Sequence, residues 1–212
     1  MTSHEPFDAV TGAFSYTGAA IADELHRRGR RVRTLTGHSD RAPSAGIPVE
    51  VHPLDFTDAA QLRHSLTGVD TLFNTYWVRF PQGNTTFETA VESSRRLFAA
   101  AAEAGVRRIV HVSITHPDVR SPYPYFRGKA LVEDDLFSLA VPYAVVRPAF
   151  LFGREGVLVK SYAWMVRQPP AVAYGVAGRC LVTRIQGADV ARLGGGPGRE
   201  DSEETVEAAQ PL

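Results

Sequence analysis

The sequence predicts an α/β protein: a Rossmann-type, doubly wound parallel sheet with helices on both faces. Two observations predict it. Short apolar runs alternate with helical patterns over roughly the first 150 residues. A turn containing two glycines, "TGAFSYTG" at residues 11–18, lies between the first apolar run and the first helical pattern.

The first four elements follow from local pattern. Residues 7–11 predict a strand that leads into the glycine turn. The next pattern, Ala19 to Arg28, has its apolar residues on one face and Gly29 as a helix stop. "RVRTLT" at 31–36 and "VEVHPLD" at 49–55 predict the second and third strands.

The remaining elements continue the alternation. "TDAAQLRHSLTG" at 57–68 predicts a helix that is capped by Thr57 or Asp58 and ends at Gly68. A longer helix is expected over residues 86–104, with Gly105 at its end, and another over residues 125–139. "DTLFNTYW", "RRIVHVSI" and "YAVVRPAF" predict strands four to six, at 70–77, 107–114 and 143–150.

Three regions are expected along the chain. Residues 1–153 form the Rossmann domain, and residues 154–193, where the periodicity weakens, form a reduced C-terminal substrate lobe. Residues 194–212 are glycine-rich and then acidic. Such a segment buries too little apolar surface to offset the entropy of ordering, so we expect a disordered tail.

Composition narrows the partners. The formal net charge is zero and 44% of the 212 residues are hydrophobic, so neither nucleic acid nor an anionic membrane is an expected partner. The single cysteine and the scattered histidines make a metal site an unexpected feature. Without an export signal or a run of ~20 apolar residues, we expect a cytoplasmic protein. A homodimer is left open.

The glycine turn predicts a phosphate-binding loop. In a dinucleotide site, backbone amides and the helix N-terminus face the pyrophosphate. Gly12 and Gly18 occupy the outer glycine positions, and Ser15 stands at the middle one, where its hydroxyl can donate to phosphate. We therefore expect the amides from Gly12 to Gly18, those of Phe14, Tyr16 and Thr17 included, to converge on a diphosphate. The alternative is a plain turn that binds nothing.

The cofactor preference depends on the end of the second strand. An NAD site places Asp or Glu there to bond the ribose hydroxyls, but this chain has no acid before Asp40. Arg33, His38 and Arg41 surround the position, and an arginine can pair with a 2′-phosphate, so NADP is favoured over NAD. Exposed loop arginines without such a role are an equally weighted alternative.

Two residues at the end of the third strand are candidate adenine contacts. The carboxylate of Asp55, followed by Phe56, can accept a hydrogen bond from the adenine amino group. A solvated loop aspartate is the alternative.

Five stretches together resemble a known superfamily. They are "TGAFSYTG", Asp55, "VSI" at 112–114, "YFRGK" at 125–129 and "RPAFLFG" at 147–153. The sequence resembles the extended and atypical branch of the short-chain dehydrogenases/reductases, which includes NAD-dependent epimerases/dehydratases and NmrA-like NAD(P)-binding proteins. The resemblance covers about residues 7–153, and more faintly reaches residue 191. Ser15 departs from it, because the family usually has glycine there.

The resemblance implies a site and two classes of function. Tyr125 would move a proton, Lys129 would lower the tyrosine pKa and hold the nicotinamide ribose, and Ser113 would orient the substrate. Thr75 and Tyr76 would line the cofactor cleft, next to Trp77. The implied function is an NADP-dependent oxidoreductase or an epimerase/dehydratase acting on a small or sugar-nucleotide substrate. The alternative is a non-catalytic NAD(P)-binding sensor or regulatory protein.

Overall fold

The computed structural model describes residues 7–38, 48–148, 150–151, 184–185 and 204–207. Its centre is a parallel sheet with the strand order β3-β2-β1-β4-β5-β6-β9. The strands are β1 (Phe7–Thr11), β2 (Arg31–Thr36), β3 (Val49–Pro53), β4 (Thr71–Asn74), β5 (Arg108–Val112), β6 (Tyr143–Arg147) and β9 (Glu204–Glu207). The predicted doubly wound α/β fold is confirmed.

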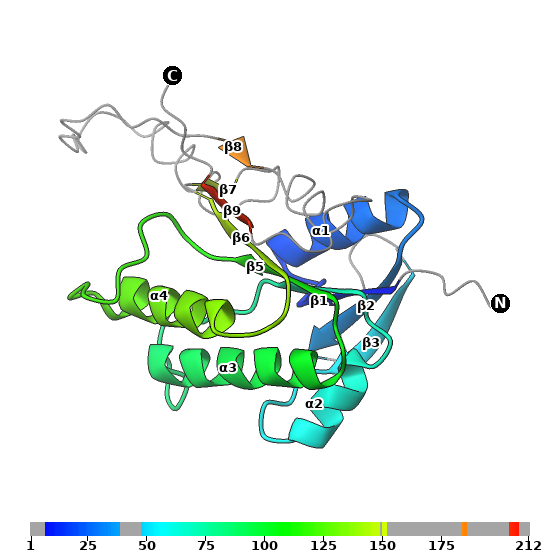
Figure 1. The fold of residues 1–212 in the computed structure, drawn as a ribbon, viewed down its shortest axis with the longest axis horizontal. Coiled ribbons are helices and arrows are strands. Elements are labelled where there is room, and N and C mark those ends of the chain that lie inside the picture. Colours follow the sequence, from blue (N-terminus) through cyan, green and yellow to red (C-terminus); the bar gives the residue numbers. More distant parts are fainter. Residues whose placement is uncertain (1–6, 39–47, 149, 152–183, 186–203, 208–212) are drawn as a thin grey trace, which may run out of the picture.

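In the described part of the chain, four helices cover the two faces of this sheet. They are α1 (Tyr16–Arg27), α2 (Ala59–Leu66), α3 (Phe87–Glu103) and α4 (Pro124–Phe137). Figure 1 shows α1 on one face, with α2, α3 and α4 side by side on the other. Three helices are followed by the glycines that were expected to stop them, and Gly29, Gly68 and Gly105 have φ values of 73°, 75° and 75°. Glycine adopts this left-handed conformation without a steric penalty.

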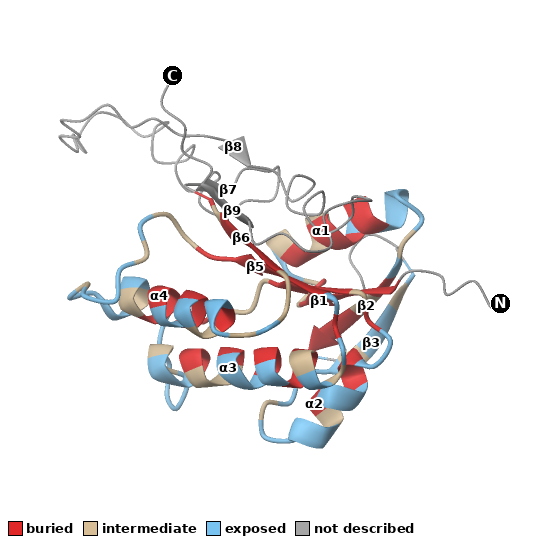
Figure 2. Ribbon diagram, viewed as in Figure 1, coloured by how far each residue is buried: buried red, intermediate tan, exposed pale blue. Residues whose placement is uncertain are grey.

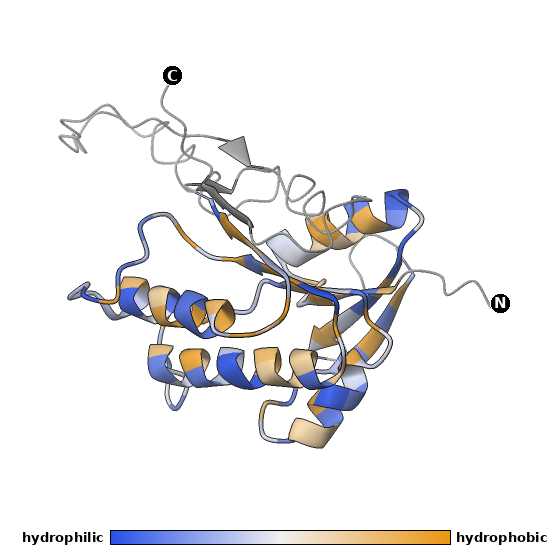
Figure 3. Ribbon diagram, viewed as in Figure 1, coloured by the Kyte–Doolittle hydropathy of each residue, from blue (hydrophilic) through white to orange (hydrophobic). Residues whose placement is uncertain are grey.

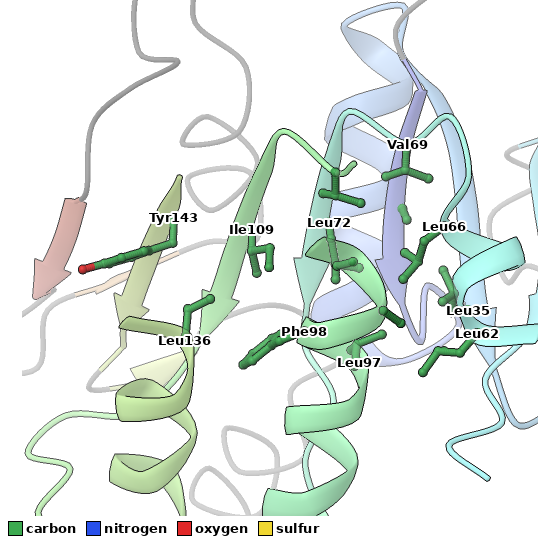
Figure 4. Packing of buried hydrophobic residues seen from close by; sticks show 14 of the residues in the cluster. Leu35, Leu62, Leu66, Val69, Leu72, Leu97, Phe98, Ile109, Leu136 and Tyr143 are labelled. Atoms are coloured by element: carbon green, nitrogen blue, oxygen red, sulfur yellow. The ribbon is translucent and has the colours of Figure 1, made fainter. Parts of the chain in front are cut away.

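Alternation along the strands divides the core into two layers. Neighbouring residues on one strand point to opposite faces, so Leu72 packs toward α2–α4 and Phe73 packs toward α1. Ile109 and Val110 divide in the same way. Figure 2 shows the buried central strands, and Figure 3 shows that each helix carries hydrophobic as well as hydrophilic residues. In Figure 4, Phe98 and Leu97 of α3 reach the sheet beside Leu136 of α4.

Helix starts depend on side-chain caps. Helix α1 begins at Tyr16, three residues before the expected start, because the Ser15 hydroxyl accepts the amide of Gly18 and caps the first turn. Of the two candidate caps for α2, it is Asp58 that accepts the Gln61 amide, at 2.9 Å. Strand β4 ends at Asn74, before the expected end, since the next two residues bond across to β1.

The C-terminal part is described only in short pieces. β7 (Phe150–Leu151) pairs with β8 (Arg184–Ile185), and β9 pairs with β6. β9 falls within residues 194–212, which were expected to be disordered. These four residues, which include β-branched Thr205 and Val206, extend the ladder at the β6 edge. The rest of the expected lobe and tail lies outside the described residues. Within the described ranges, no helix has the length and apolar character needed to span a bilayer.

Candidate functional site

The carboxyl ends of β1 and β4 form the candidate site. These two strands are neighbours, but the chain leaves β1 for α1 on one face and leaves β4 for α3 on the other (Figure 1). Such a switch in direction opens a crevice outside the carboxyl edge, where ligands of doubly wound sheets bind. At this edge the glycine turn follows β1, and residues 75–77 follow β4.

Gly12 and Gly18 have the backbone geometry that their positions in the turn predicted. Gly12 has φ 65° and turns the chain so tightly that the Ser15 amide donates to its carbonyl at 2.8 Å. A Cβ added to Gly18 would lie 2.1 Å from the Gly12 oxygen. No side chain fits at that distance, so glycine at position 18 is what lets α1 start against β1.

The amides of the turn differ from the expectation. We expected them to converge on a diphosphate, but several donate within the chain, namely those of Gly12 to the Leu35 carbonyl, Ala13 to the Thr34 hydroxyl, Ser15 to the Gly12 carbonyl and Gly18 to the Ser15 hydroxyl. Among the described residues, no acceptor bonds the amides of Phe14 and Thr17. Thr17 is in the first turn of α1, whose amides have no partner inside the helix. The phosphate cradle is therefore narrower than predicted.

Ser15 adds a further donor to this cradle. Its oxygen accepts the Gly18 amide at 3.2 Å, so its own O–H proton remains available to a ligand. The side chain is exposed and lies at the positive end of the α1 dipole. The serine that departs from the glycine pattern thus caps the helix and keeps an exposed hydroxyl at the helix start.

Thr11, which the sequence did not indicate as a site residue, fixes the position of Thr75 and Tyr76 across from the glycine turn. The Thr11 hydroxyl oxygen accepts the amides of Thr75 at 2.7 Å and Tyr76 at 3.1 Å, and the Thr75 hydroxyl donates to the Thr11 carbonyl at 2.6 Å. Buried Asn74 accepts the Tyr76 amide at 3.0 Å and contacts His111 Nδ1 at 3.1 Å. These contacts hold residues 75 and 76 against the end of β1.

His111, expected to be a core residue, is fully buried. Burial, followed by the charge of Lys129, lowers its pKa well below the usual value, so the ring is neutral at pH 7. Its polar contact with Asn74 could not be foreseen, because it joins two strands that are 37 residues apart in the chain.

The candidate adenine contacts lie at the third strand's end, as expected. Asp55 is exposed and accepts both the amide and the hydroxyl of Thr57, at 2.8 and 2.7 Å, which lowers the pKa of its carboxyl. The rings of Phe56 and Tyr76 pack with centroids 4.6 Å apart. This contact links the end of β3 to the wall of the crevice.

Arg33 lies at the wrong edge of the sheet for the role it was given. Its guanidinium donates to the carbonyls of Ser65 at 2.7 Å and Thr67 at 3.1 Å, and stacks 4.6 Å from the ring of Phe7, the first residue of β1. These partners mark the amino edge, opposite the glycine turn. The prediction that Arg33 binds a 2′-phosphate is therefore not supported. His38 is exposed just beyond β2, and Arg41 lies outside the described residues.

Replacing Arg33 with methionine should therefore leave cofactor selectivity unchanged. We expect the ratio of NADPH to NADH affinity to stay within about twofold of wild type, while the free energy of unfolding falls by about 2 kcal/mol as the bonds to α2 are lost. Calorimetric titration and urea denaturation measure the two effects. If the folded variant lost its preference for NADPH, the result would support a role of Arg33 in binding the 2′-phosphate.

Lys129 is buried at the carboxyl end of β5. Its Nζ donates to the Val112 carbonyl at 3.0 Å and lies 4.6 Å from the centroid of the Trp77 ring. Burial lowers the pKa of Lys129 to about 7, against an opposing effect of the Glu133 carboxylate. The side chain is held by specific contacts although its charge is poorly solvated.

Ser113 follows directly on the strand that accepts this lysine. Its amide donates to the Val146 carbonyl at 2.8 Å, which anchors it beside β6. Its hydroxyl oxygen is buried and has no hydrogen-bond partner among the described residues. A buried hydroxyl without a partner is costly in a folded protein, so this group is a candidate ligand contact.

Tyr125 lies in the first turn of α4, one turn before Lys129. Its ring is half-buried among aromatic side chains, with centroids 6.0 Å from Trp77, 5.7 Å from Phe87 and 5.7 Å from Phe126. Burial raises the pKa of Tyr125, although the charge of Arg79 opposes the change. The resemblance implied a pKa lowered by Lys129. Here desolvation of the phenol is the larger effect.

The comparison with protein families agrees with this geometry. A family model described as NAD(P)H-binding matches residues 12–170, which is well over half of the chain. The chain belongs to this NAD(P)H-binding family. The resemblance that the sequence predicted is confirmed at the level of the superfamily, and the NAD(P)H-binding family accounts for the glycine turn, the crevice and the strand order together.

The chain is also similar to individual curated proteins. Sterol demethylase protein B of Methylococcus capsulatus is 33% identical over 168 residues, which is 68% of this chain and 51% of that protein. The chain spans about half or less of the length of the curated relatives it matches.

Solved structures share the fold at lower identity. MoeE5 in complex with UDP-glucose and NAD is 20% identical, with a TM-score of 0.72 over 95% of this chain and 75% of that one. Citrobacter sp. triphenylmethane reductase complexed with NADP(H) is 19% identical, with a TM-score of 0.66 over 95% of this chain and 68% of that one.

Proposed function

We propose that this NAD(P)H-binding chain is an oxidoreductase that acts on a small molecule with Tyr125, Lys129 and Ser113. The observation that carries the proposal is the meeting of Lys129 and Ser113 at the carboxyl end of β5. The ammonium bonds the carbonyl of residue 112, and the free hydroxyl belongs to residue 113. A buried lysine and an unpartnered buried hydroxyl are unfavourable for folding alone, which favours a functional role.

The residues present fit a dinucleotide. The amides of Phe14 and Thr17 and the hydroxyl of Ser15 would bind the diphosphate at the start of α1. Asp55 and the packed pair of Phe56 and Tyr76 would contact the adenosine half. Lys129 would bind the nicotinamide ribose. When bound, the nicotinamide ring would supply or accept the hydride.

The cofactor we favour is NADP, with NAD as the alternative. Thr36 ends β2, Gly37 and His38 follow it, and none of the three offers the carboxylate that bonds ribose hydroxyls in an NAD site. His38 is exposed there and could face a 2′-phosphate. Arg33 does not support this preference, because its guanidinium lies at the opposite edge of the sheet.

Tyr125 and Ser113 would have different roles at the substrate oxygen. Burial raises the pKa of Tyr125, so the phenol holds its proton at pH 7, and this is the proton that would pass to the oxygen of a carbonyl that is being reduced. The Ser113 hydroxyl would donate a hydrogen bond to that same oxygen and so orient the substrate. Trp77 covers Lys129 and limits the access of water to the ammonium.

Replacing Tyr125 with phenylalanine should separate chemistry from binding. We expect turnover to fall at least about a hundredfold, because the proton donor is lost, while the affinity for NADPH changes less than about twofold. Oxidation of NADPH can be followed with small carbonyl compounds and a triphenylmethane dye, and reduction of NADP+ can be followed with UDP-glucose, whose alcohol groups can donate a hydride. The exposed Tyr123, two residues earlier, gives a matched Tyr→Phe control that should keep wild-type turnover. Equal turnover in both variants would rule out the role of Tyr125.

A second candidate is a non-catalytic NAD(P)H sensor. It is favoured by the aromatic packing of Tyr125 and by the indole of Trp77 that covers Lys129, since neither group is poised for chemistry while covered. Tight NAD(P)H binding without turnover on any tested substrate would support this candidate over the enzyme.

A further inference from the structure

Helix α4 buries two charged side chains one turn apart. Lys129 is 3% exposed and Glu133 is 2% exposed. Residues four apart lie on the same face of a helix, so both side chains enter the layer between α4 and the sheet. Burying a charge is unfavourable unless an opposite charge or hydrogen bonds accompany it. The mechanism proposed above uses the lysine and leaves the glutamate unexplained.

Glu133 is anchored by an arginine on the sheet. Arg147, the last residue of β6, donates from Nε to both carboxylate oxygens at 3.2 Å and from Nη2 to Oε2 at 2.5 Å. Such a forked contact fixes the direction of the carboxylate as well as its charge. On the neighbouring strand, the Val112 carbonyl that binds Lys129 lies in register with Val146, one residue before this arginine.

Among the described residues, Glu133 is the one anionic group that acts on the ammonium. Lys129 faces neutral His111 from β5 and the Trp77 ring from the loop after β4, and the protonated Tyr125 lies one turn earlier on α4. Arg79 acts on Tyr125 and adds positive charge to this surrounding. Only the carboxylate of Glu133 favours the charged lysine, and it does so against burial.

We propose that Glu133 is a positioning residue for Lys129, and that its carboxylate, clamped by Arg147, keeps the ammonium charged and directed at the end of β5. The role of Lys129 in this statement rests on the proposed function. Without the carboxylate, the buried lysine gives up its proton more readily, and a neutral amine is free to turn from the Val112 carbonyl. Arg147 also links Glu133 and Lys129 on α4 to the end of β6.

Titration of the two lysines by NMR tests this directly in the protein without cofactor. Isotope-labelled lysine gives signals from Lys129 and Lys160 alone, and a Lys160→Arg variant assigns them. In Glu133→Gln we expect the Lys129 titration to move to lower pH by roughly one unit, because the favourable charge is gone. Asp134→Asn removes an exposed carboxylate from the same helix and should leave the Lys129 titration unchanged.

The outcomes separate this proposal from the proposed function. An unchanged Lys129 titration in folded Glu133→Gln overturns the positioning role, whether or not the protein binds NADPH. If Glu133→Gln does not fold, the double variant Glu133→Gln, Arg147→Gln replaces the ion pair with two neutral amides. It should show a smaller downward shift, because the positive charge of Arg147 is removed together with the carboxylate, and a titration that is unchanged or moves upward there also overturns the proposal. A shift without any NADPH binding supports the positioning role and refutes the cofactor function instead.

In the enzyme, the same shift should be visible in the pH profile. The alkaline limb of NADPH affinity, where affinity falls as Lys129 loses its proton, should move to lower pH with the lysine titration in Glu133→Gln and stay in place in Asp134→Asn. A purely structural effect of Glu133 would lower affinity equally at all pH values, which would contradict the proposal.

Discussion

Replacing Lys129 with methionine is expected to remove a rise in stability that the wild-type protein shows between about pH 7 and pH 9.5. The pKa of Lys129 falls from 10.5 to about 7 on folding because the side chain is buried. Between these values the unfolded chain holds a proton that the folded chain has lost, so the free energy of unfolding increases with pH. At about 1.4 kcal/mol per pH unit, the rise is about 3 kcal/mol. Urea denaturation at the two pH values measures it.

The matched control for this prediction is the other lysine of the chain. Lys160→Met should keep the wild-type dependence on pH, since the effect belongs to the buried position and not to lysine content. Methionine has nearly the volume of lysine without its charge, so Lys129→Met should fold and be more stable than wild type near pH 7. Parallel pH dependences in Lys129→Met and wild type would show that the ammonium is not desolvated as described.

Replacing Ser15 with aspartate should abolish cofactor binding without harming the fold. Aspartate caps helices as well as serine does, and a negative charge at the start of α1 interacts favourably with the helix dipole. Stability should therefore stay equal or rise by about 0.5 kcal/mol. The carboxylate would, however, stand where a diphosphate is expected, and repulsion at this distance should weaken NADPH and NADH binding by roughly a hundredfold. Calorimetry measures the affinities, and thermal denaturation measures the stability.

Asparagine at the same position is the control for shape. It caps the helix through its amide oxygen and is isosteric with aspartate but neutral. Ser15→Asn should bind NADPH within about fivefold of wild type. The difference in NADPH affinity between the aspartate and asparagine variants then measures the repulsion between the carboxylate and a bound phosphate. Any disturbance of the turn affects both variants and cancels.

Much of the fold was predictable because its signals are local. Gly29, Gly68 and Gly105 each ended a helix as expected, since a left-handed residue after a helix strongly favours glycine. Apolar runs of strand length, separated by amphipathic helices, were enough to predict a parallel sheet. Gly12 and Gly18 were recognised from their place between a strand and a helix, and their geometry matches that expectation.

What could not be predicted depends on contacts between distant segments. Arg33 was placed at the cofactor because it lies near the end of a strand, but its guanidinium reaches residues 32 and 34 positions further along the chain, at the opposite edge. The internal bonds of the turn amides depend on Leu35 and Thr34 of the neighbouring strand. Nothing local indicates either partner.

The environment of Glu133 was predictable only in part from the sequence. Its spacing of four residues from Lys129, on a helix whose other buried side chains are largely apolar, was visible in the sequence and predicts a shared face. Its partner Arg147 was noted only as the first residue of the "RPAFLFG" stretch at 147–153. The ion pair that joins the two becomes evident only when α4 is seen to lie over β6.

We infer that the first turn of α1 receives the diphosphate of NAD(P)H, and calorimetric titration of NADPH and NADH into wild type, Ser15→Asn and Ser15→Asp tests this contact. We expect saturable binding to the first two proteins and a loss of roughly a hundredfold in the third, with all three equally folded. Equal affinity in the aspartate and asparagine variants would contradict it, because no phosphate could then lie at that turn.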